Sequence, residues 1–284
     1  KGYVLSMLAL LSAGAERTRH LQEAIASFDF ALLERTREIA PIEWAQTNSN
    51  KGNVLAELAR TVGSTTREET LRRAIASYEA VCEVYSRQEM PQQWARMQLN
   101  KGVALSELAD LLPGTSRAKA LREALTCFQA ALTALHSEAT PDIWAKVQAN
   151  KGSALHRLTD ILQGSDRRDI IEEALACFND ALTVFTFEHT FVDWAMVQNN
   201  RGLTFRTFAE ELTDAAREEA LQEAIRCYDA VLSVFPLEGP PVSWIMLQNN
   251  KGTALTEMAF LLKGGARVEK LQSALSCFDA ALTH

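Results

Sequence analysis

Apolar residues recur at helical spacing along the whole chain. Two amphipathic stripes follow one another between residues 41 and 85, and their apolar positions are Trp44, Ala45, Gly52, Leu55, Leu58, Ala59 and Val62, then Leu71, Ala74, Ile75, Tyr78, Val81, Cys82 and Tyr85. At about 100° per residue, each set covers one broad face of a helix. No stretch alternates between apolar and polar residues at period two, so the pattern predicts helices and no strands.

The ends of these helices are predicted from capping residues. Pro41 fits the first turn of a helix, where its missing N–H costs nothing, and Gly63 is expected to end that helix. Thr66 and Glu69 have the spacing of a capping box at the start of the second helix. Each helix then has about 20 residues, or about 30 Å. The sister residues expected to end first helices are Gly14, Gly114, Gly164 and Gly264, and those expected to cap second helices are Ser116 and Asp166.

The pair of stripes repeats every 50 residues without a register slip. Glycine, tryptophan and asparagine mark the first helix, in the columns Gly2, Gly52, Gly102, Gly152, Gly202, Gly252; Trp44, Trp94, Trp144, Trp194, Trp244; and Asn50, Asn100, Asn150, Asn200, Asn250. Alanine and an aromatic residue mark the second helix, in the columns Ala24, Ala74, Ala124, Ala174, Ala224, Ala274 and Phe28, Tyr78, Phe128, Phe178, Tyr228, Phe278. The small alanine is expected to let helices approach closely, and the aromatic ring fills the space beside it.

These columns predict copies of one structural unit. A single amphipathic pair cannot bury its apolar face alone, so neighbouring pairs stack into an α-solenoid. We therefore predict an all-α fold and one array over residues 1–284. Its units are 1–50, 51–100, 101–150, 151–200, 201–250 and 251–284, the first and last incomplete. Neither end has a polar capping repeat, so we expect a piece of a longer array.

Two basic columns are expected to join repeats. Lys51 and its sisters lie inside the apolar arc, where a lysine runs its stem over the core. It is expected to lie against the preceding tryptophan or to meet a second-helix acid, such as Asp29, Glu79 or Asp229. Arginines start each second helix, where the helix dipole disfavours a cation. They are expected to bind a carboxylate or the carbonyls that end a first helix; this column is Arg17, Arg67, Arg117, Arg167, Arg217 and Arg267.

The motifs resemble those of tetratricopeptide repeats. The second helix carries Ala-x3-aromatic followed by a small residue, as in Ala124, Phe128 and Ala131, and the first helix carries Gly-x2-Leu, as in Gly52 and Leu55. The usual unit has about 34 residues, so this 50-residue unit looks like a long-helix variant, similar to arrays in large multidomain bacterial proteins. The resemblance implies a right-handed superhelix whose first helices line the concave face.

That concave face supplies the candidate binding site. A carboxamide can pair with both the N–H and the C=O of one peptide unit, and the asparagine column resembles a ladder that holds extended peptides by their backbone. The alternative is that each asparagine bonds to a neighbouring helix and fixes the stacking of repeats; both interpretations stay open. The predicted groove residues are Asn50, Asn100, Asn150, Asn200, Asn250, Asn199, Asn249, Arg96, Lys146, His156 and Arg206.

The composition of the chain limits the classes of partner that it is expected to bind. The 284 residues hold 29 Lys+Arg against 36 Asp+Glu, a net charge of -7, and this acidic balance argues against nucleic acid. No apolar run reaches the roughly 20 residues of a membrane span. The cysteines number five, an odd count that excludes a complete disulfide framework and favours a reducing, cytoplasmic compartment.

Catalytic chemistry has little support in the sequence. Cys127, Cys177, Cys227 and Cys277 share one column, so stacking places them about 10 Å or more apart, too far for one metal ion. They are better interpreted as small buried residues. The five histidines share neither a column nor a ligand spacing: His20, His136, His156, His189 and His284. We therefore expect no enzyme activity, no metal and no cofactor.

The sequence favours a scaffold that binds a protein or peptide in its concave groove. Two alternatives stay open. One is a regulatory sensor arm of a larger protein with a linked peptidase or nucleotide-binding switch domain, as the resemblance implies. The other is a structural array that stacks end to end.

Overall fold

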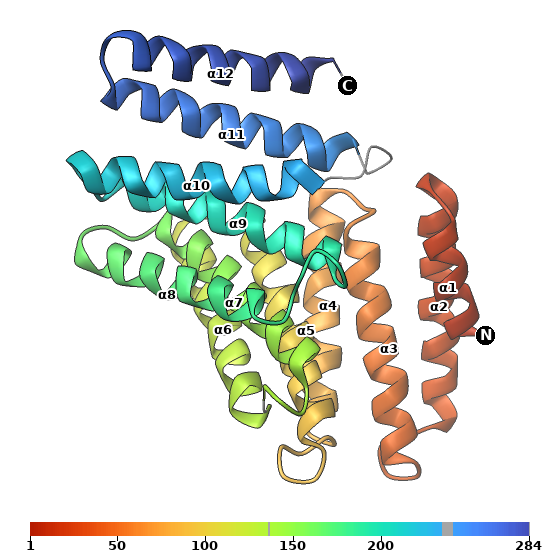
Figure 1. Cartoon of the computed structure of the whole chain (residues 1–284). Coiled ribbons are helices and arrows are strands. Elements are labelled where there is room, and N and C mark those ends of the chain that lie inside the picture. The colour runs from red at the N-terminus through yellow and green to blue at the C-terminus, as the bar shows by residue number, and fades with distance from the viewer. Residues whose placement is uncertain (136, 235–240, 284) are drawn as a thin grey trace. The chain divides into compact units, whose positions relative to one another are not determined.

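The structure, a computed structural model, describes residues 1–135, 137–234 and 241–283 (Figure 1). Within these ranges the chain forms twelve α-helices and no strand, which confirms the predicted all-α fold. The helices are α1 (Gly2–Leu11), α2 (Gly14–Glu34), α3 (Pro41–Ala59), α4 (Ser64–Cys82), α5 (Pro91–Ala109), α6 (Gly114–Ala134), α7 (Pro141–Thr159), α8 (Ser165–Leu182), α9 (Phe191–Glu210), α10 (Asp214–Val234), α11 (Pro241–Leu261) and α12 (Gly264–Leu282).

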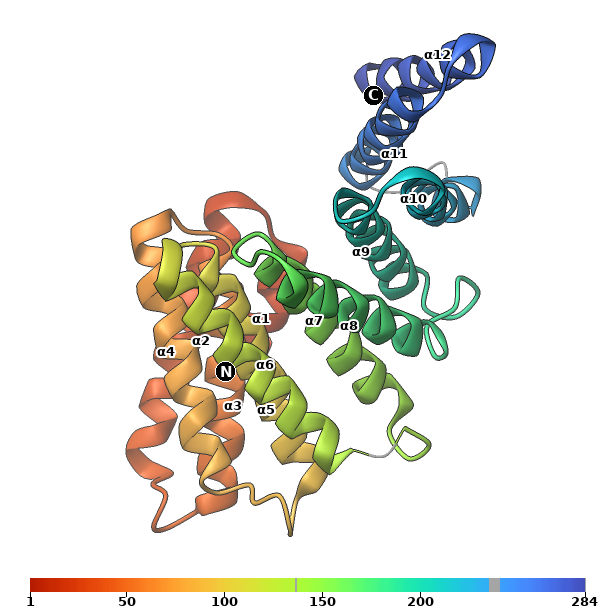
Figure 2. The same ribbon diagram turned by 90° about the vertical axis from the view of Figure 1, so that its left-hand side faces the viewer.

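The chain divides into two compact units. Unit 1 comprises Lys1–Ala154 and unit 2 comprises Leu155–His284, and the division falls inside α7. Within each unit, consecutive helices form antiparallel pairs, as α3 with α4 and α9 with α10 (Figures 1 and 2). The second helix of one pair packs on the first helix of the next, as α4 does on α5 and α10 on α11.

The pairs α1–α2, α3–α4, α5–α6, α9–α10 and α11–α12 close through contact between the glycine and aromatic columns. A Cβ atom on Gly52 would lie 2.7 Å from Cε1 of Tyr78, and one on Gly102 would lie 2.5 Å from Cε1 of Phe128. Gly202 meets Tyr228 in the same way. The glycine is therefore required because the ring of the second helix occupies the place of its side chain. The alanine column is buried throughout, as expected for small residues between packed helices.

The lysine column joins successive repeats. Lys51 Nζ lies 2.6 Å from Asp29 Oδ1, so α3 is tied to the preceding α2. Lys101 pairs with Glu79 at 2.7 Å. A third pair joins Lys251 to Asp229 at 2.6 Å. These are the acids that the sequence predicted, and the pairs lie at corresponding places in both units.

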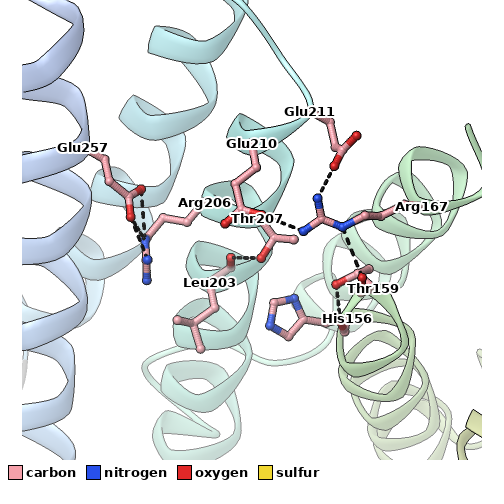
Figure 3. Close-up of polar contacts among 9 residues, drawn as sticks. All are labelled: His156, Thr159, Arg167, Leu203, Arg206, Thr207, Glu210, Glu211 and Glu257. Atoms are coloured by element: carbon pink, nitrogen blue, oxygen red, sulfur yellow. Dashed lines mark hydrogen bonds and ion pairs between the residues drawn. The ribbon is translucent and has the colours of Figure 1, made fainter. Parts of the chain in front are cut away.

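The arginine column joins repeats as well. The Arg17 guanidinium pairs with Glu57 of the next first helix, and Arg67 lies 3.8 Å from Glu107. In unit 2, the Nε of Arg167 donates to the carbonyl of Thr159, which ends α7, at 3.1 Å. The same guanidinium pairs with Glu210, at 2.6 Å, and with Glu211 (Figure 3). Carboxylates and a helix-ending carbonyl are the partners expected for this column.

The predicted capping residues are wrong. Helix α4 begins at Ser64 with Gly63 as its N-cap, so Thr66 lies inside the first turn and no side chain caps the helix. Helices α6 and α8 likewise begin at Gly114 and Ser165 without a side-chain cap, which places Ser116 and Asp166 inside them.

The loop glycines act at the start of the second helix rather than at the end of the first. Gly14, Gly114 and Gly264 are the first residues of α2, α6 and α12, and Gly164 is the N-cap of α8. All four have positive φ, between 46° and 69°. This left-handed backbone turns the chain directly into the second helix, so the helix begins before the predicted caps.

Candidate functional site

A polar hollow lies in unit 1 between the first helices α3 and α5. Its volume is about 360 Å³. Its walls bring together two predicted groove residues, Asn50 of α3 and Arg96 of α5. The residues that line it, called the polar hollow from here on, are Gln46, Ser49, Asn50, Tyr85, Gln92, Gln93, Arg96 and Met97.

The polar hollow offers hydrogen bonds and one positive charge. Side-chain amides come from Gln46, Asn50, Gln92 and Gln93, and each supplies donors and an acceptor. Arg96 is exposed, and among the described residues it makes no ion pair. A planar guanidinium without a carboxylate partner has its five N–H donors available for a ligand.

An apolar hollow lies at the same place in the repeat in unit 2, between α9 and α11. Its volume is about 280 Å³. Met196 and Met246 occupy the column that holds Gln46 and Arg96 in the polar hollow, and both are exposed. The residues that line it, called the apolar hollow from here on, are Phe191, Val192, Ala195, Met196, Asn199, Ser243, Met246 and Leu247.

Of the residues that line the apolar hollow, only Asn199 belongs to the predicted groove. The groove residues were predicted for their polar side chains, and Val192, Met196 and Met246 have none. A signal was nevertheless present in the sequence, because one column reads Gln46, Arg96, Lys146, Met196, Met246 along the chain. A change from polar to apolar residues in an exposed column marks a place where the surface changes its chemistry.

The asparagine column serves contacts between repeats. Asn100 Nδ2 donates to Asn53 Oδ1 at 3.0 Å, and the same oxygen accepts a bond from the Tyr78 hydroxyl at 2.9 Å. In unit 2, Asn250 Nδ2 donates to Asn199 Oδ1 at 2.9 Å. These bonds join the first helices of adjacent repeats, as the stacking interpretation expects.

The remaining asparagines differ from one another. Asn199 Nδ2 donates to Asn200 Oδ1 at 3.3 Å, and Asn150 Nδ2 donates to the Lys146 carbonyl one turn earlier at 2.8 Å. Asn50 is exposed and lines the polar hollow. The role of the column in ligand binding stays a prediction, and Asn50 is the member whose position favours it most.

Two predicted residues take part in contacts within unit 2. Arg206 of α9 binds the carboxylate of Glu257 of α11, with an Nη2–Oε1 distance of 2.8 Å (Figure 3). Burial by itself would lower the pKa of Arg206, but the hydrogen bond and the charge of Glu257, together with the contribution of Tyr228, outweigh it and raise the pKa. His156 Nδ1 lies 3.1 Å from the Thr204 hydroxyl, and burial lowers the pKa of its imidazole. Both side chains are thus partly occupied in joining first helices.

The last two predicted residues are exposed on first helices. Lys146 lies on α7 and Asn249 lies on α11. Lys146 continues the column of Gln46 and Arg96 into the next repeat of unit 1, and Asn249 follows Met246 by three residues on α11.

The cysteine positions confirm the interpretation of the thiols as packing residues. All five thiols are free, and four of them are buried. Burial raises the pKa of Cys82 to about 11, and it does the same for Cys227, so both stay protonated near neutral pH. Among the described residues, no group of three or more His, Cys, Asp or Glu side chains is placed to hold a metal ion. His136 and His284 lie outside the described residues.

No helix within the described part of the chain is both long and apolar enough to cross a membrane.

Comparisons with known proteins find likenesses among solved structures and no family. No protein-family model matches the chain. No curated protein matches it either. One similar solved structure is described as a "circular tandem repeat protein with novel repeat topology and enhanced subunit contact surfaces"; it is 18% identical with a TM-score of 0.40, and the match covers 94% of this chain and 65% of that one. Another, described under "computational design of self-assembling cyclic protein homooligomers", is 16% identical with a TM-score of 0.25, over 99% of this chain and 89% of that one.

The helix pairs, their 50-residue spacing and their repeated contacts define the class of this molecule. It is an all-α helical repeat protein.

Proposed function

We propose that this helical repeat protein is a scaffold that binds a protein or peptide ligand in the hollows between successive first helices. The observation that carries the proposal is the polar hollow, where Asn50 and Arg96, both predicted from the sequence, line one cavity of about 360 Å³. Membership of the tetratricopeptide repeat family, in its long-helix form, belongs to the same proposal and is supported by the glycine–ring contact that recurs in five of the helix pairs.

The polar hollow would bind an extended segment through its amides. The carboxamides of Gln46, Asn50 and Gln92 can each pair with peptide N–H and C=O groups, at a net gain of about 1 kcal/mol for each hydrogen bond. Arg96, which has no ion-pair partner within the described ranges, adds a cation and would favour a ligand with a carboxylate in this place. Such bonds demand little of the ligand sequence apart from that one acid.

The apolar hollow would add affinity by taking an aliphatic side chain. Burial of a Leu, Ile or Met side chain between Met196, Met246 and Phe191 would contribute about 1.5–3 kcal/mol. Methionine side chains adapt their shape to different ligands, so this hollow would tolerate several aliphatic residues. Affinity near micromolar is expected once the ordering of the ligand is included.

The proposal assigns no bond-making step and no cofactor to these residues. The five thiols are free. The odd number of cysteines in the sequence supports a reducing, cytoplasmic setting.

A displayed library of random peptides tests the proposal directly. Peptides selected on the wild-type chain would be synthesised, and their binding would be measured by fluorescence anisotropy. The Arg96→Ala and Asn50→Ala variants should each weaken binding about fivefold to tenfold, since each removes hydrogen bonds to the ligand. Arg122→Ala is the matched control, because Arg122 is an exposed arginine on the second helix α6. Equal affinities for all three variants would refute the proposed site.

A further inference from the structure

The apolar hollow lies on a surface that the stacking of repeats leaves open. Val192 is 76% exposed, and Met196 and Met246 are 50% and 52% exposed. Gln46 of α3 and Arg96 of α5 occupy the column of the two methionines in repeats that have neighbours on both sides, and both are exposed. A further repeat therefore does not cover this column, and the apolar side chains stay accessible to a partner.

An aromatic cluster extends this surface toward the loop before α9. The ring centroid of Trp194 lies 6.0 Å from that of Phe187 and 6.2 Å from that of Phe191, which lines the apolar hollow. In unit 1, the column of Phe187 holds Arg37 and Arg87, which bind groups of the next repeat. Phe187 has no such polar group and is 47% exposed. A contiguous exposed apolar patch of this kind marks a surface where a partner binds.

The negative charge of the chain is concentrated in unit 2. Unit 2 holds 11 Lys+Arg against 19 Asp+Glu, a formal net charge of -8, whereas unit 1 holds 18 against 17, a formal net charge of +1. Glu188 and Asp193 follow Phe187 and Val192 directly in the chain, and neither makes an ion pair among the described residues. Charges of opposite sign favour association, so the partner that fits this surface is basic.

The apolar hollow offers few groups for hydrogen bonds to a ligand. The polar side chains that line it are Asn199 and Ser243. The Asn199 carboxamide is bonded at both ends, because its Nδ2 donates to Asn200 Oδ1 at 3.3 Å and its Oδ1 accepts from Asn250 Nδ2 at 2.9 Å. An extended peptide would leave backbone N–H and C=O groups without partners there, whereas a helix bonds these groups within itself. The hollow therefore fits a helix better than an extended segment.

We propose that the apolar hollow binds an amphipathic helix whose apolar face carries aliphatic residues and whose polar face carries Lys or Arg. The inference rests on the proposed function and names the class of ligand for one of its two hollows. Aliphatic side chains at i, i+3 and i+4 of the bound helix contact Met196 and Met246. Its basic residues lie in the negative field of unit 2, to which Glu188 and Asp193 contribute.

A labelled model peptide built from Leu, Lys and Ala tests the proposal on the 284-residue chain. The peptide has about 18 residues, long enough to form a helix on binding, with Leu at i, i+3, i+4 and i+7 and Lys on the opposite face. Fluorescence anisotropy should give a Kd near micromolar. A scrambled peptide of the same composition and a peptide with Glu in place of Lys should each bind about tenfold more weakly or worse. Equal affinities for the three peptides would overturn the proposal.

A proline at the centre of the model peptide distinguishes helical from extended binding. Proline breaks a helix, whereas an extended peptide accepts it, so the affinity should fall about tenfold or more. Circular dichroism should also show that the original peptide gains helical signal when it binds. Unchanged affinity of the proline peptide would show that the hollow holds an extended segment, and that result refutes the proposal.

Substitutions in the chain test where the peptide binds. Met196→Gln combined with Met246→Gln should weaken binding about tenfold, because both methionines lose apolar contact with the bound helix. Ile39→Gln is the matched control, an exposed apolar residue in the loop between α2 and α3, and it should leave the affinity unchanged. Glu188→Gln combined with Asp193→Asn should lower the association rate severalfold at low salt. Equal effects of the methionine and control substitutions would refute the proposed surface.

The polar hollow provides an independent comparison. Arg96→Ala should leave binding of the model peptide unchanged, because Arg96 lies in unit 1. If library peptides bind through Arg96 and the model peptide does not bind, this inference is refuted and the proposed function stands. Loss of both kinds of binding would refute both.

Discussion

The polar hollow of unit 1 and the apolar hollow of unit 2 occupy the same place in the repeat and have opposite chemistry. Both lie between adjacent first helices, α3 and α5 in one case and α9 and α11 in the other. The packing of the first helix on its second helix is shared, because Gly52 and Gly202 both contact a tyrosine ring. The comparison shows that the repeat keeps one set of columns for packing and leaves another set free to change the surface.

The largest expected effect concerns the packing that both units share. Gly52→Ala and Gly252→Ala should each destabilise the chain by about 1–3 kcal/mol, because the added Cβ would lie 2.7 Å from an aromatic ring of the second helix in both cases. Urea unfolding followed by circular dichroism measures the change. Gly63→Ala is the control, since a Cβ atom at this position would meet nothing within 4 Å and its φ of -67° suits any residue. If the free energy of unfolding stayed unchanged for only one of the two variants, the glycine–ring contact would not have the same role in both units.

An exchange of the hollows tests whether their chemistry decides ligand choice. Met196→Gln combined with Met246→Arg gives the apolar hollow the residues found at Gln46 and Arg96. A peptide that binds there through an aliphatic side chain should lose about tenfold or more in affinity, as about 1.5–3 kcal/mol of apolar burial is removed. Isothermal titration with the selected peptide measures this loss. Unchanged affinity would show that the residues lining the hollows do not decide which ligand binds.

The hydrogen bond of Tyr78 is a single contact in which the two units differ. Tyr78→Phe should destabilise the chain by about 0.5–1.5 kcal/mol, because Asn53 Oδ1 loses the hydroxyl that lies 2.9 Å away. The same oxygen accepts the bond from Asn100, so the Tyr78 bond supports the link between α3 and α5, the first helices that line the polar hollow. In the repeat of Tyr228 in unit 2, the counterpart of Asn53 is Leu203, which cannot accept such a bond. Thermal unfolding of the variant, with Phe128→Tyr as a comparison in a repeat that naturally lacks the hydroxyl, checks the assignment.

The smallest expected effect lies in the loop that precedes α10. Asp214 has a φ of 51°, in the column where Gly14, Gly114, Gly164 and Gly264 take the same left-handed backbone. Asp214→Gly should stabilise the chain by about 0.5–1 kcal/mol, since glycine adopts this conformation without the steric cost of a Cβ. Gly114→Asp is the reciprocal variant and should destabilise by a similar amount. A loss of stability in Asp214→Gly would contradict this account of the loop.

The fold follows from the sequence in considerable detail, because each structural column appears several times. For Lys51, Lys101 and Lys251 the sequence left two contacts open, the preceding tryptophan or a second-helix acid, and the structure shows the pairs with the acids. The first residue of each second helix was harder to predict from the sequence. A capping motif such as Thr66 with Glu69 is local, whereas α4 already begins at Ser64, and its sister helices begin at a left-handed residue that no capping motif marks.

The candidate site was predicted only in part. Asn50 and Arg96 line the same hollow, and their role in binding stays a prediction, whereas Arg206 and His156 have partners on neighbouring helices. Their partners Glu257 and Thr204 come from other repeats, and no pattern within one helix reveals such pairing. The apolar hollow lies almost wholly outside the predicted groove, because a search for exposed polar residues cannot find a surface that binds through apolar contact.

The lysine–acid pairs give the array a direction. At every junction where such a pair is seen, the acid comes from the earlier repeat and the lysine from the later one, as with Asp29 and Lys51. Gene duplication or deletion by whole periods would preserve this order, whereas a rearrangement by another length would shift the acid column out of register with the lysine column. The pairs therefore provide a rule for lengthening or shortening the molecule, and a designer who splices repeats from its two halves could follow the same rule.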